Sequence, residues 1–139
     1  MSDLDVVLAK INVIKTCLSL IEKAKVKEAD LEFRLSIYEL NLQRAIQACI
    51  DLANIVLSKE GLGLPTTYRQ SFQILEKHLI LTPELTRKMA SMVGFRNISV
   101  HDYEQINMAI VQNIVDHYLS DFETFYKVIY ARVQNWPES

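Results

Sequence analysis

Apolar residues recur every three or four positions along most of this chain, which is the spacing of one face of a helix. The first such stretch covers about residues 3–25, and the second covers about residues 28–59. In the second stretch Leu40, Ile50 and Ile55 lie beside the main apolar stripe. Its apolar face is therefore wide, which indicates contacts on two sides, with the core and with a partner. Because no stretch alternates as strands do, the pattern predicts an all-α fold.

Sparse glycine and proline divide the rest of the pattern into further helices. The chain has only three of each, so its elements should be few and long. The segment KEGLGLPTTY ends the second helix at one of its glycines, and its threonines are caps for a third helix over about residues 68–78. Thr82 and Pro83 suit the start of a fourth helix, with Gly94 near its apparent end. The last helix covers about residues 104–134.

Length and composition favour a single helical bundle. The 139 residues fit one domain, residues 1–139, built from about five helices. Half of the residues are hydrophobic, which is high for a small domain. Two explanations stay open: apolar surface buried between two chains, as in a homodimer, or a full core.

The charge of the chain restricts how it would contact RNA. A net charge of −2 excludes a general basic field that would attract nucleic acid. Contact with RNA would need a local concentration of arginine and lysine. Symmetric pairing of two chains is one way to create it.

The cysteines and the N-terminus indicate the compartment. Cys17 and Cys49 belong to helical apolar patterns, which favours buried free thiols in a reducing environment. The N-terminus lacks the basic region of a secretory signal. No uncharged apolar run approaches the roughly 20 residues of a membrane span. We therefore expect a cytoplasmic protein without a membrane segment.

The stretch MVGFRNISVHDY differs from the helical pattern around it. It combines Arg96, His101 and Tyr103 with glycine, asparagine, serine and β-branched residues, which lower helix propensity. On an unbroken helix Arg96 and His101 would point about 140° apart. We therefore expect a bend after Phe95 that turns His101 back toward Arg96. The alternative is a helix–helix corner with an exposed arginine and a tolerated histidine.

An arginine and a histidine in one site suit cleavage of RNA. Imidazole gives and takes protons near neutral pH, and guanidinium binds phosphate through two parallel hydrogen bonds. RNA carries its own nucleophile, the 2′-hydroxyl. His101 would serve as general base or acid, and Arg96 would stabilise the charge on phosphorus. This chemistry requires no metal, and His78, His101 and His117 are too scattered to suggest a metal site.

These residues also carry a family resemblance. Arg96, His101 and Tyr103 match the R-x-x-x-x-H-x-Y motif of HEPN-domain proteins. The segments YELNLQRAIQACIDLANIVLSKEGLGLPTTYRQSF and MVGFRNISVHDY resemble the HepT toxin family of HepT/MntA-type toxin–antitoxin systems, and the resemblance extends from about residue 4 to residue 125. It implies an all-helical homodimer that cleaves RNA without a metal or cofactor, with two copies of the motif facing each other across a cleft. Arg96 and His101 fall on the family's catalytic positions.

The resemblance further implies a regulatory partner. Tyr103 falls on the tyrosine to which, in related systems, an MntA-like nucleotidyltransferase antitoxin transfers AMP from ATP. The added phosphate would compete with RNA for Arg96 and repel the substrate. The chain would then be the toxin of a type II, or AMPylation-controlled type VII, toxin–antitoxin system.

Four further residues have two interpretations each. Asn97 either holds the expected bend through hydrogen bonds to the backbone or is an ordinary asparagine at a helix end. Asp51 either orients His101 or Arg96 from a neighbouring helix or is a solvated carboxylate. Tyr68 and Arg69 would line the cleft, although packing for the tyrosine and a surface position for the arginine are the preferred interpretations.

Three functions follow, in this order of preference. The first is a ribonuclease toxin. The second is a non-catalytic docking or regulatory subunit of a nucleotidyltransferase. The third is a helical scaffold in which the motif is structural. Replacing His101 separates them, because only the first function loses RNA cleavage with that side chain.

Overall fold

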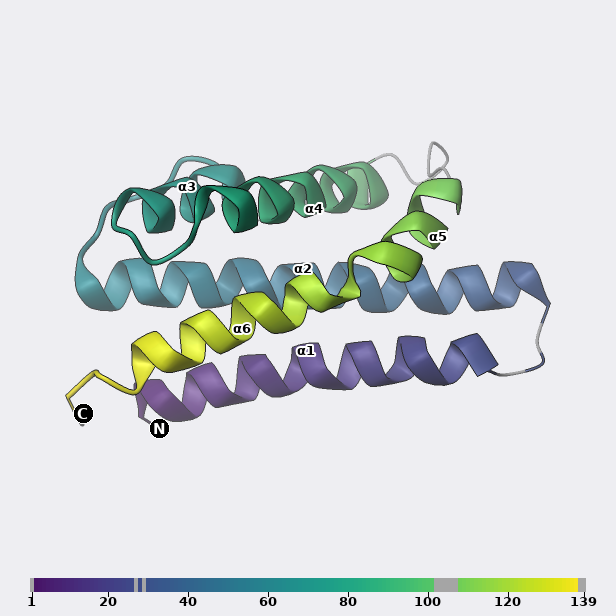
Figure 1. The fold of residues 1–139 in the computed structure, drawn as a ribbon, viewed down its shortest axis with the longest axis horizontal. Helices are drawn as coiled ribbons and strands as arrows, with labels where there is room; N and C mark the ends of the chain where they lie inside the picture. The colour runs from purple at the N-terminus through teal and green to yellow at the C-terminus, as the bar shows by residue number, and fades with distance from the viewer. Residues whose placement is uncertain (1, 27, 29, 102–107, 138–139) are drawn as a thin grey trace.

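The structure is a computed structural model, and it describes residues 2–26, 28, 30–101 and 108–137. All the regular elements in these residues are helices: α1 (Asp3–Val26), α2 (Leu31–Glu60), α3 (Tyr68–Lys77), α4 (Pro83–His101), α5 (Met108–His117) and α6 (Leu119–Val133). The long helices α1 and α2 run side by side, and α6 lies along both (Figure 1). Helices α3 and α4 pack on the other side of α2 from α1 (Figure 1). The prediction of an all-α bundle is confirmed.

Helix α2 is the centre of the bundle. It contacts each of the other five helices, which explains the width of its apolar face. Buried apolar side chains from all six helices form one core around it. Phe72 of α3 and Phe125 of α6 meet edge to face within this core, with ring centroids 5.6 Å apart. Both rings are fully buried, so their contact packs the inner face of α3 against the rest of the bundle.

The helix ends follow the chemistry of their sequences. The Asp30 side chain accepts a hydrogen bond from the Phe33 N–H at 2.7 Å and caps α2. Gly61 ends α2 with a left-handed φ of 64°, which a residue without a Cβ adopts at little cost. Thr82 caps α4 by accepting from the Leu85 N–H at 3.1 Å. The predicted start of α4 is therefore confirmed.

The single helix predicted over residues 104–134 is wrong for its described part. The chain changes direction at Tyr118, where φ is −123° and ψ is 5°, and this separates α5 from α6. No glycine or proline lies there, so the local sequence gave no signal. The cause is tertiary packing. Val111, Ile114 and Val115 of α5 are buried beside α2, whereas α6 runs along both α1 and α2.

The end of α6 and Trp136 beyond it pack against the end of α2. Arg132 of α6 binds Glu60 through two hydrogen bonds, from Nε at 2.9 Å and from Nη2 at 2.6 Å. The Trp136 indole N–H donates to the same carboxylate at 3.0 Å. The hydrogen bond from Arg132 is the main reason why the pKa of Glu60 lies below its usual value. This cluster fastens α6 to α2.

Two other expectations concern the compartment. Cys17 and Cys49 are buried free thiols, as predicted, and burial raises the pKa of both. In the part of the chain that the structure describes, no helix is both long enough and apolar enough to cross a bilayer.

Candidate functional site

The turn before α3 fixes the position of Tyr68. Thr67 Oγ1 accepts a hydrogen bond from the Gln70 N–H at 3.1 Å. The Gln70 side-chain oxygen in turn accepts from the N–H of Thr66 at 2.7 Å and from its hydroxyl at 2.8 Å. These bonds order the first turn of α3, whose N–H groups have no partners within the helix. Tyr68, the first residue of α3, is held in place as a result.

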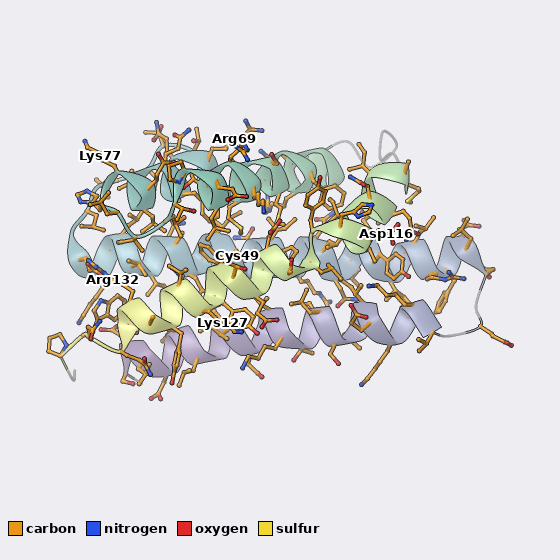
Figure 2. All side chains as sticks on the ribbon, in the orientation of Figure 1. Cys49, Arg69, Lys77, Asp116, Lys127 and Arg132 are labelled. Atoms are coloured by element: carbon orange, nitrogen blue, oxygen red, sulfur yellow. The ribbon has the colours of Figure 1, made fainter. Side chains whose placement is uncertain are left out.

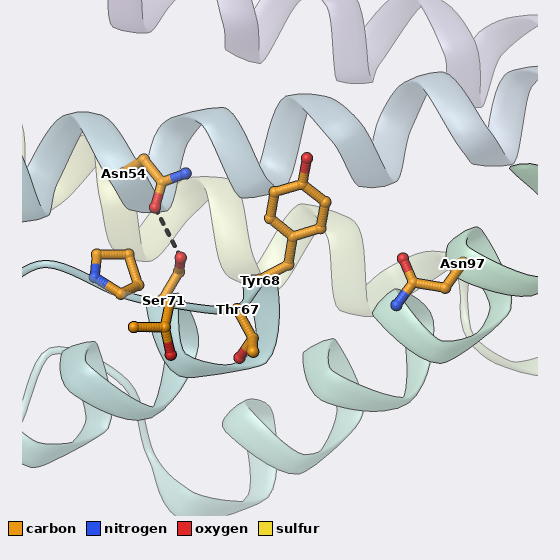
Figure 3. Close-up of a pocket in the computed structure, with 7 residues that line it drawn as sticks. Asn54, Thr67, Tyr68, Ser71 and Asn97 are labelled. Carbon is orange, nitrogen blue, oxygen red and sulfur yellow. Dashed lines mark hydrogen bonds between the residues drawn. The ribbon is translucent and has the colours of Figure 1, made fainter. Parts of the chain in front are cut away.

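An open pocket of about 450 Å³ lies where α2, the start of α3 and the end of α4 meet (Figure 3). At its base the fully buried Ser71 donates its hydroxyl hydrogen to Asn54 Oδ1 at 2.7 Å. The lining residues are Asn54, Pro65, Thr66, Thr67, Tyr68, Ser71 and Asn97. They offer amides, hydroxyls and one aromatic ring, and no carboxylate is among these described residues. The pocket is thus polar without being acidic.

Arg96 lies on the buried side of α4 and contacts Tyr68, which lines this pocket. Leu85, Met89 and Met92 form the buried stripe of the helix, and Arg96 takes the next position at the same spacing. An arginine rarely lies on such a face without a partner. Its Cζ atom lies 5.1 Å from the centroid of the Tyr68 ring, which is within the range of a cation–π contact. Among the described residues no carboxylate forms an ion pair with Arg96, so its N–H donors are left for another anion.

The bend expected after Phe95 is wrong, because α4 continues as a helix through Gly94 to His101. Low helix propensity costs at most about 1 kcal/mol per residue, and the buried contacts of Val93 and Phe95 offset it. Asn97 follows Arg96 by about 100° around the helix, and His101 lies only about 40° beyond Asn97. Asn97, which lines the pocket, therefore separates the two positions.

Not every residue of the motif is described. The side chains of residues 98–101 lie outside the described part of the structure, and so does all of Tyr103. The roles predicted for His101 and Tyr103 therefore stay predictions.

Positive charge gathers on α3 and α4. Residues 68–101 contain five basic and two acidic side chains, a net charge of +3, so the rest of the chain carries −5. Figure 2 shows Arg69 on the outer side of this pair of helices. A Cβ added to Gly94 would come within 2.9 Å of Arg69 Nη2, so the glycine makes room for this guanidinium against α4. The positive charge of the chain is therefore concentrated in these residues, where Lys88 is paired with Glu84 and Asp121.

Asn97 and Asp51, the two predicted supporting residues, lie in different surroundings. Asn97 lines the pocket, but it holds no bend. Asp51 binds Lys10 of α1 at 2.9 Å and the side-chain amide of Gln47 at 2.9 Å. Both of its oxygens have partners in these contacts, and the structure does not bring it to Arg96.

Sequence reasoning undervalued Tyr68. Packing was the preferred interpretation, yet the ring is 39% exposed, lines the pocket and lies beneath Arg96. Asn54 and Ser71 were not identified at all. One signal was present, since Arg96 continues the stripe of Met89 and Met92, and a charged residue in an apolar stripe requires a partner.

The arrangement is suited to binding an anion beside an aromatic ring. Among the side chains that the structure describes, no three from His, Cys, Asp or Glu are grouped so that they could hold a metal ion. Arg96, which lies over Tyr68, carries a guanidinium, a group whose geometry suits binding of phosphate.

Comparison with known proteins shows which family this chain is similar to. The model of the family described as "Ribonuclease HepT-like" matches residues 10–129. The mRNA nuclease HepT of Shewanella oneidensis is 38% identical over 130 residues, which cover 91% of this chain and 98% of that protein. The tRNA nuclease HepT of Aphanizomenon flos-aquae is 42% identical over 71 residues, 51% of this chain and 48% of that protein.

A solved structure agrees over the same length. The tri-AMPylated HEPN toxin of Shewanella oneidensis, in complex with the MNT antitoxin, superposes with a TM-score of 0.85 at 38% identity, covering 91% of this chain and 98% of that one. Matches of this extent in sequence and in fold show common descent. The chain belongs to the ribonuclease HepT-like family.

Proposed function

We propose that this protein is the toxin of a toxin–antitoxin pair and that it is a metal-independent endoribonuclease. The observation that carries the proposal is the guanidinium of Arg96, which lies over Tyr68 beside a polar pocket and pairs with none of the described carboxylates. The similarity to an mRNA nuclease over nearly the whole chain supports RNA as the substrate.

In the proposed reaction RNA supplies the nucleophile. The His101 imidazole takes the proton of a 2′-hydroxyl, whose oxygen attacks the adjacent phosphorus. The bond from phosphorus to the 5′-oxygen breaks, and that oxygen receives a proton. The products are a 2′,3′-cyclic phosphate and a 5′-hydroxyl. Arg96 binds the non-bridging oxygens, where negative charge develops in the transition state.

A homodimer would supply two imidazoles, one to take a proton and one to give it. Exposed apolar side chains support such pairing: Phe33 and Leu40 of α2 are 50% and 51% exposed. They belong to the N-terminal half of α2, which lies at the same end of the bundle as the end of α4 (Figure 1). Burying them against a second copy would bring two sites close together.

We infer the same control by modification as in the AMPylated relative. The Tyr103 phenol oxygen would attack the α-phosphorus of ATP on an MntA-like nucleotidyltransferase, with release of pyrophosphate and a proton. The fold match to an AMPylated toxin bound to its antitoxin supports this inference. The added phosphate would compete for Arg96 and repel RNA.

The test of catalysis compares two histidines. His101→Ala should abolish RNA cleavage by the purified chain in EDTA and relieve growth arrest in cells that express it. The control is His117→Ala, which removes an exposed histidine on α5 and should leave both unchanged. Equal cleavage by wild type and His101→Ala would show that the proposed catalysis is wrong.

The test of regulation is the intact mass of the chain, produced alone and together with its nucleotidyltransferase partner. We expect an increase by one or more AMP groups that maps to Tyr103 and disappears in Tyr103→Phe. AMP on another molecule, with His101 irrelevant to any activity, would instead favour a non-catalytic docking subunit.

A further inference from the structure

We propose that the pocket between α2, α3 and α4 is a nucleotide subsite, which holds one unpaired nucleotide of single-stranded RNA next to the phosphate that is cleaved. This inference rests on the proposed ribonuclease function and names the part of the protein that selects the RNA. The residues that would bind the base are Tyr68, by stacking, and Asn54 and Asn97, which would determine specificity.

The size and lining of the pocket suit a nucleotide. Its volume of about 450 Å³ falls within the range of sites for small molecules, about 300–1,000 Å³. Its lining combines one aromatic ring with several amide and hydroxyl groups (Figure 3). A base offers a flat aromatic face and a polar edge, and a ribose offers hydroxyls, so each kind of group has a counterpart in the lining.

Tyr68 provides a surface for stacking. Tyr68 is 39% exposed and lines the pocket, so a base can reach the part of the ring that Arg96 does not cover without unfolding of the chain. A base inside a duplex could not, because its faces are already stacked. Stacking on a tyrosine binds any of the four bases, so this residue would contribute affinity more than selectivity.

The two amides would read the edge of the base. Ser71 occupies the carbonyl oxygen of Asn54 with a hydrogen bond of 2.7 Å, and this leaves the amide N–H₂ group as the donor on that side chain. Figure 3 shows this nitrogen on the side of Asn54 that faces Tyr68, and the Asn97 amide directed toward Tyr68 from α4. The Asn54 N–H₂ group is a fixed donor, whereas the Asn97 amide can either donate or accept. Together they can distinguish bases by the positions of their acceptors.

Charge connects this subsite to the proposed chemistry. Arg96 contacts the ring of Tyr68, so the phosphate of a nucleotide stacked there would lie within reach of the guanidinium. His101 follows Asn97 by one helical turn on α4. The bound base would therefore decide which phosphodiester is presented to Arg96 and His101. In this arrangement Ser71 is a positioning residue, because it acts through Asn54.

The first experiment measures binding without cleavage. A seven-nucleotide single-stranded RNA is titrated into the full-length His101→Ala chain, which carries in addition Tyr68→Ala, Tyr68→Phe or Tyr130→Ala. We expect a loss of affinity on the order of tenfold for Tyr68→Ala and near-normal affinity for Tyr68→Phe, which keeps the aromatic face. Tyr130→Ala is the matched control, since Tyr130 on α6 is 40% exposed, and it should bind normally.

The outcomes are distinct. Normal binding by Tyr68→Ala, with an unchanged melting temperature, would overturn the subsite. Equal losses for Tyr68→Ala and Tyr130→Ala would also overturn it, because they indicate a general effect of removing an exposed ring. Neither result depends on catalysis. If the parent chain with histidine at position 101 cuts no RNA, the ribonuclease proposal fails, whatever the binding shows.

The second experiment measures selectivity in the active chain. Cleavage sites in a random-sequence RNA are mapped for wild type, Asn54→Ala, Asn97→Ala and Ser71→Ala, with Asn135→Ala as the control for removing an exposed amide. We expect the preference for the base beside the cut to weaken by about threefold to tenfold in the first two variants. Ser71→Ala should alter the preference for the same base, because Ser71 acts through Asn54. Asn135→Ala should keep the wild-type profile. An unchanged profile in all variants would overturn the assignment of base readout to these amides.

Discussion

Arg132 and Arg96 differ in what they bind. Arg132 forms a double hydrogen bond with Glu60, which Trp136 also contacts, so its donors are used within the protein. Arg96 lies on the ring of Tyr68 beside an open pocket, and none of the described carboxylates pairs with it. The first arrangement holds α6 to α2. The second is the arrangement that we expect of an arginine that binds an anionic substrate, as proposed above.

The largest expected effect comes from removing each arginine in turn. Arg96→Ala should lower the rate of RNA cleavage by about 10²–10³-fold, because a donor to the developing charge is lost. Arg132→Ala should leave cleavage unchanged and lower the free energy of unfolding by about 0.5–1.5 kcal/mol, because the pair is partly exposed. Cleavage assays and urea denaturation of both variants measure this contrast.

Arg96→Lys separates the effect of the positive charge from that of the guanidinium shape. It keeps the charge but not the forked donor, so it should recover only part of the lost rate. Loss of cleavage in Arg132→Ala equal to that in Arg96→Ala would remove the distinction between the two arginines.

Gly61, next to Glu60, and Gly94, next to the Arg69 side chain, should respond to substitution in opposite directions. Gly61 has a φ of +64° at the end of α2, so Gly61→Ala should destabilise the fold by about 1 kcal/mol. Gly94 is helical and meets only the end of the flexible Arg69 side chain, so Gly94→Ala should raise stability by up to about 1 kcal/mol. It should also weaken RNA binding a few-fold, because Arg69 must move. Urea denaturation and RNA titration test both, and a clear loss of stability in Gly94→Ala would contradict a continuous α4.

The contribution of the Arg132–Glu60 pair to stability should depend on pH. The pKa of Glu60 is lowered in the folded state, chiefly by hydrogen bonds from Arg132, so its contribution to stability is present above the unfolded pKa near 4.5 and is lost as the pH falls through the folded value. The stability difference between wild type and Arg132→Ala should therefore shrink below about pH 4.5. Urea denaturation at pH 7 and at pH 3.5–4 measures it, and a gap that widens on acidification would contradict the sign.

The smallest effect is expected at Asp51. Because its partners are Lys10 and Gln47, Asp51→Asn should change stability by less than about 1 kcal/mol and leave RNA cleavage unaltered. Initial rates of cleavage test this directly. A loss of cleavage without a loss of stability would return Asp51 to the supporting role that the sequence suggested.

Local chemistry predicted most of the helix ends. Each of these ends depends on one residue and its near neighbours, as at the caps Thr67 and Thr82 and at the left-handed Gly61. The local sequence is therefore sufficient to predict them. The turn at Tyr118 was missed because packing of α5 and α6 on different neighbours causes it. The bend after Phe95 was wrongly predicted because buried contacts outweigh the weak propensity of the residues around it.

The candidate site was only half visible in the sequence. Arg96 and His101 were predicted through a motif whose spacing is local, and of the two side chains the structure describes that of Arg96. Tyr68 lies 28 residues before Arg96, and nothing in either segment states that the two side chains meet. Asn54 and Ser71 come from different helices and became recognisable only through the hydrogen bond between them.

The central claim is that Arg96 and His101 act on a phosphodiester that the RNA attacks with its own 2′-hydroxyl. It is tested most directly by the products from a defined RNA in EDTA, compared with the same RNA carrying a single 2′-deoxy nucleotide at the cut. We predict a 2′,3′-cyclic phosphate from the first substrate and no cut at that position in the second. Continued cleavage of the deoxy substrate, or a fragment with a 5′-phosphate, would contradict the account.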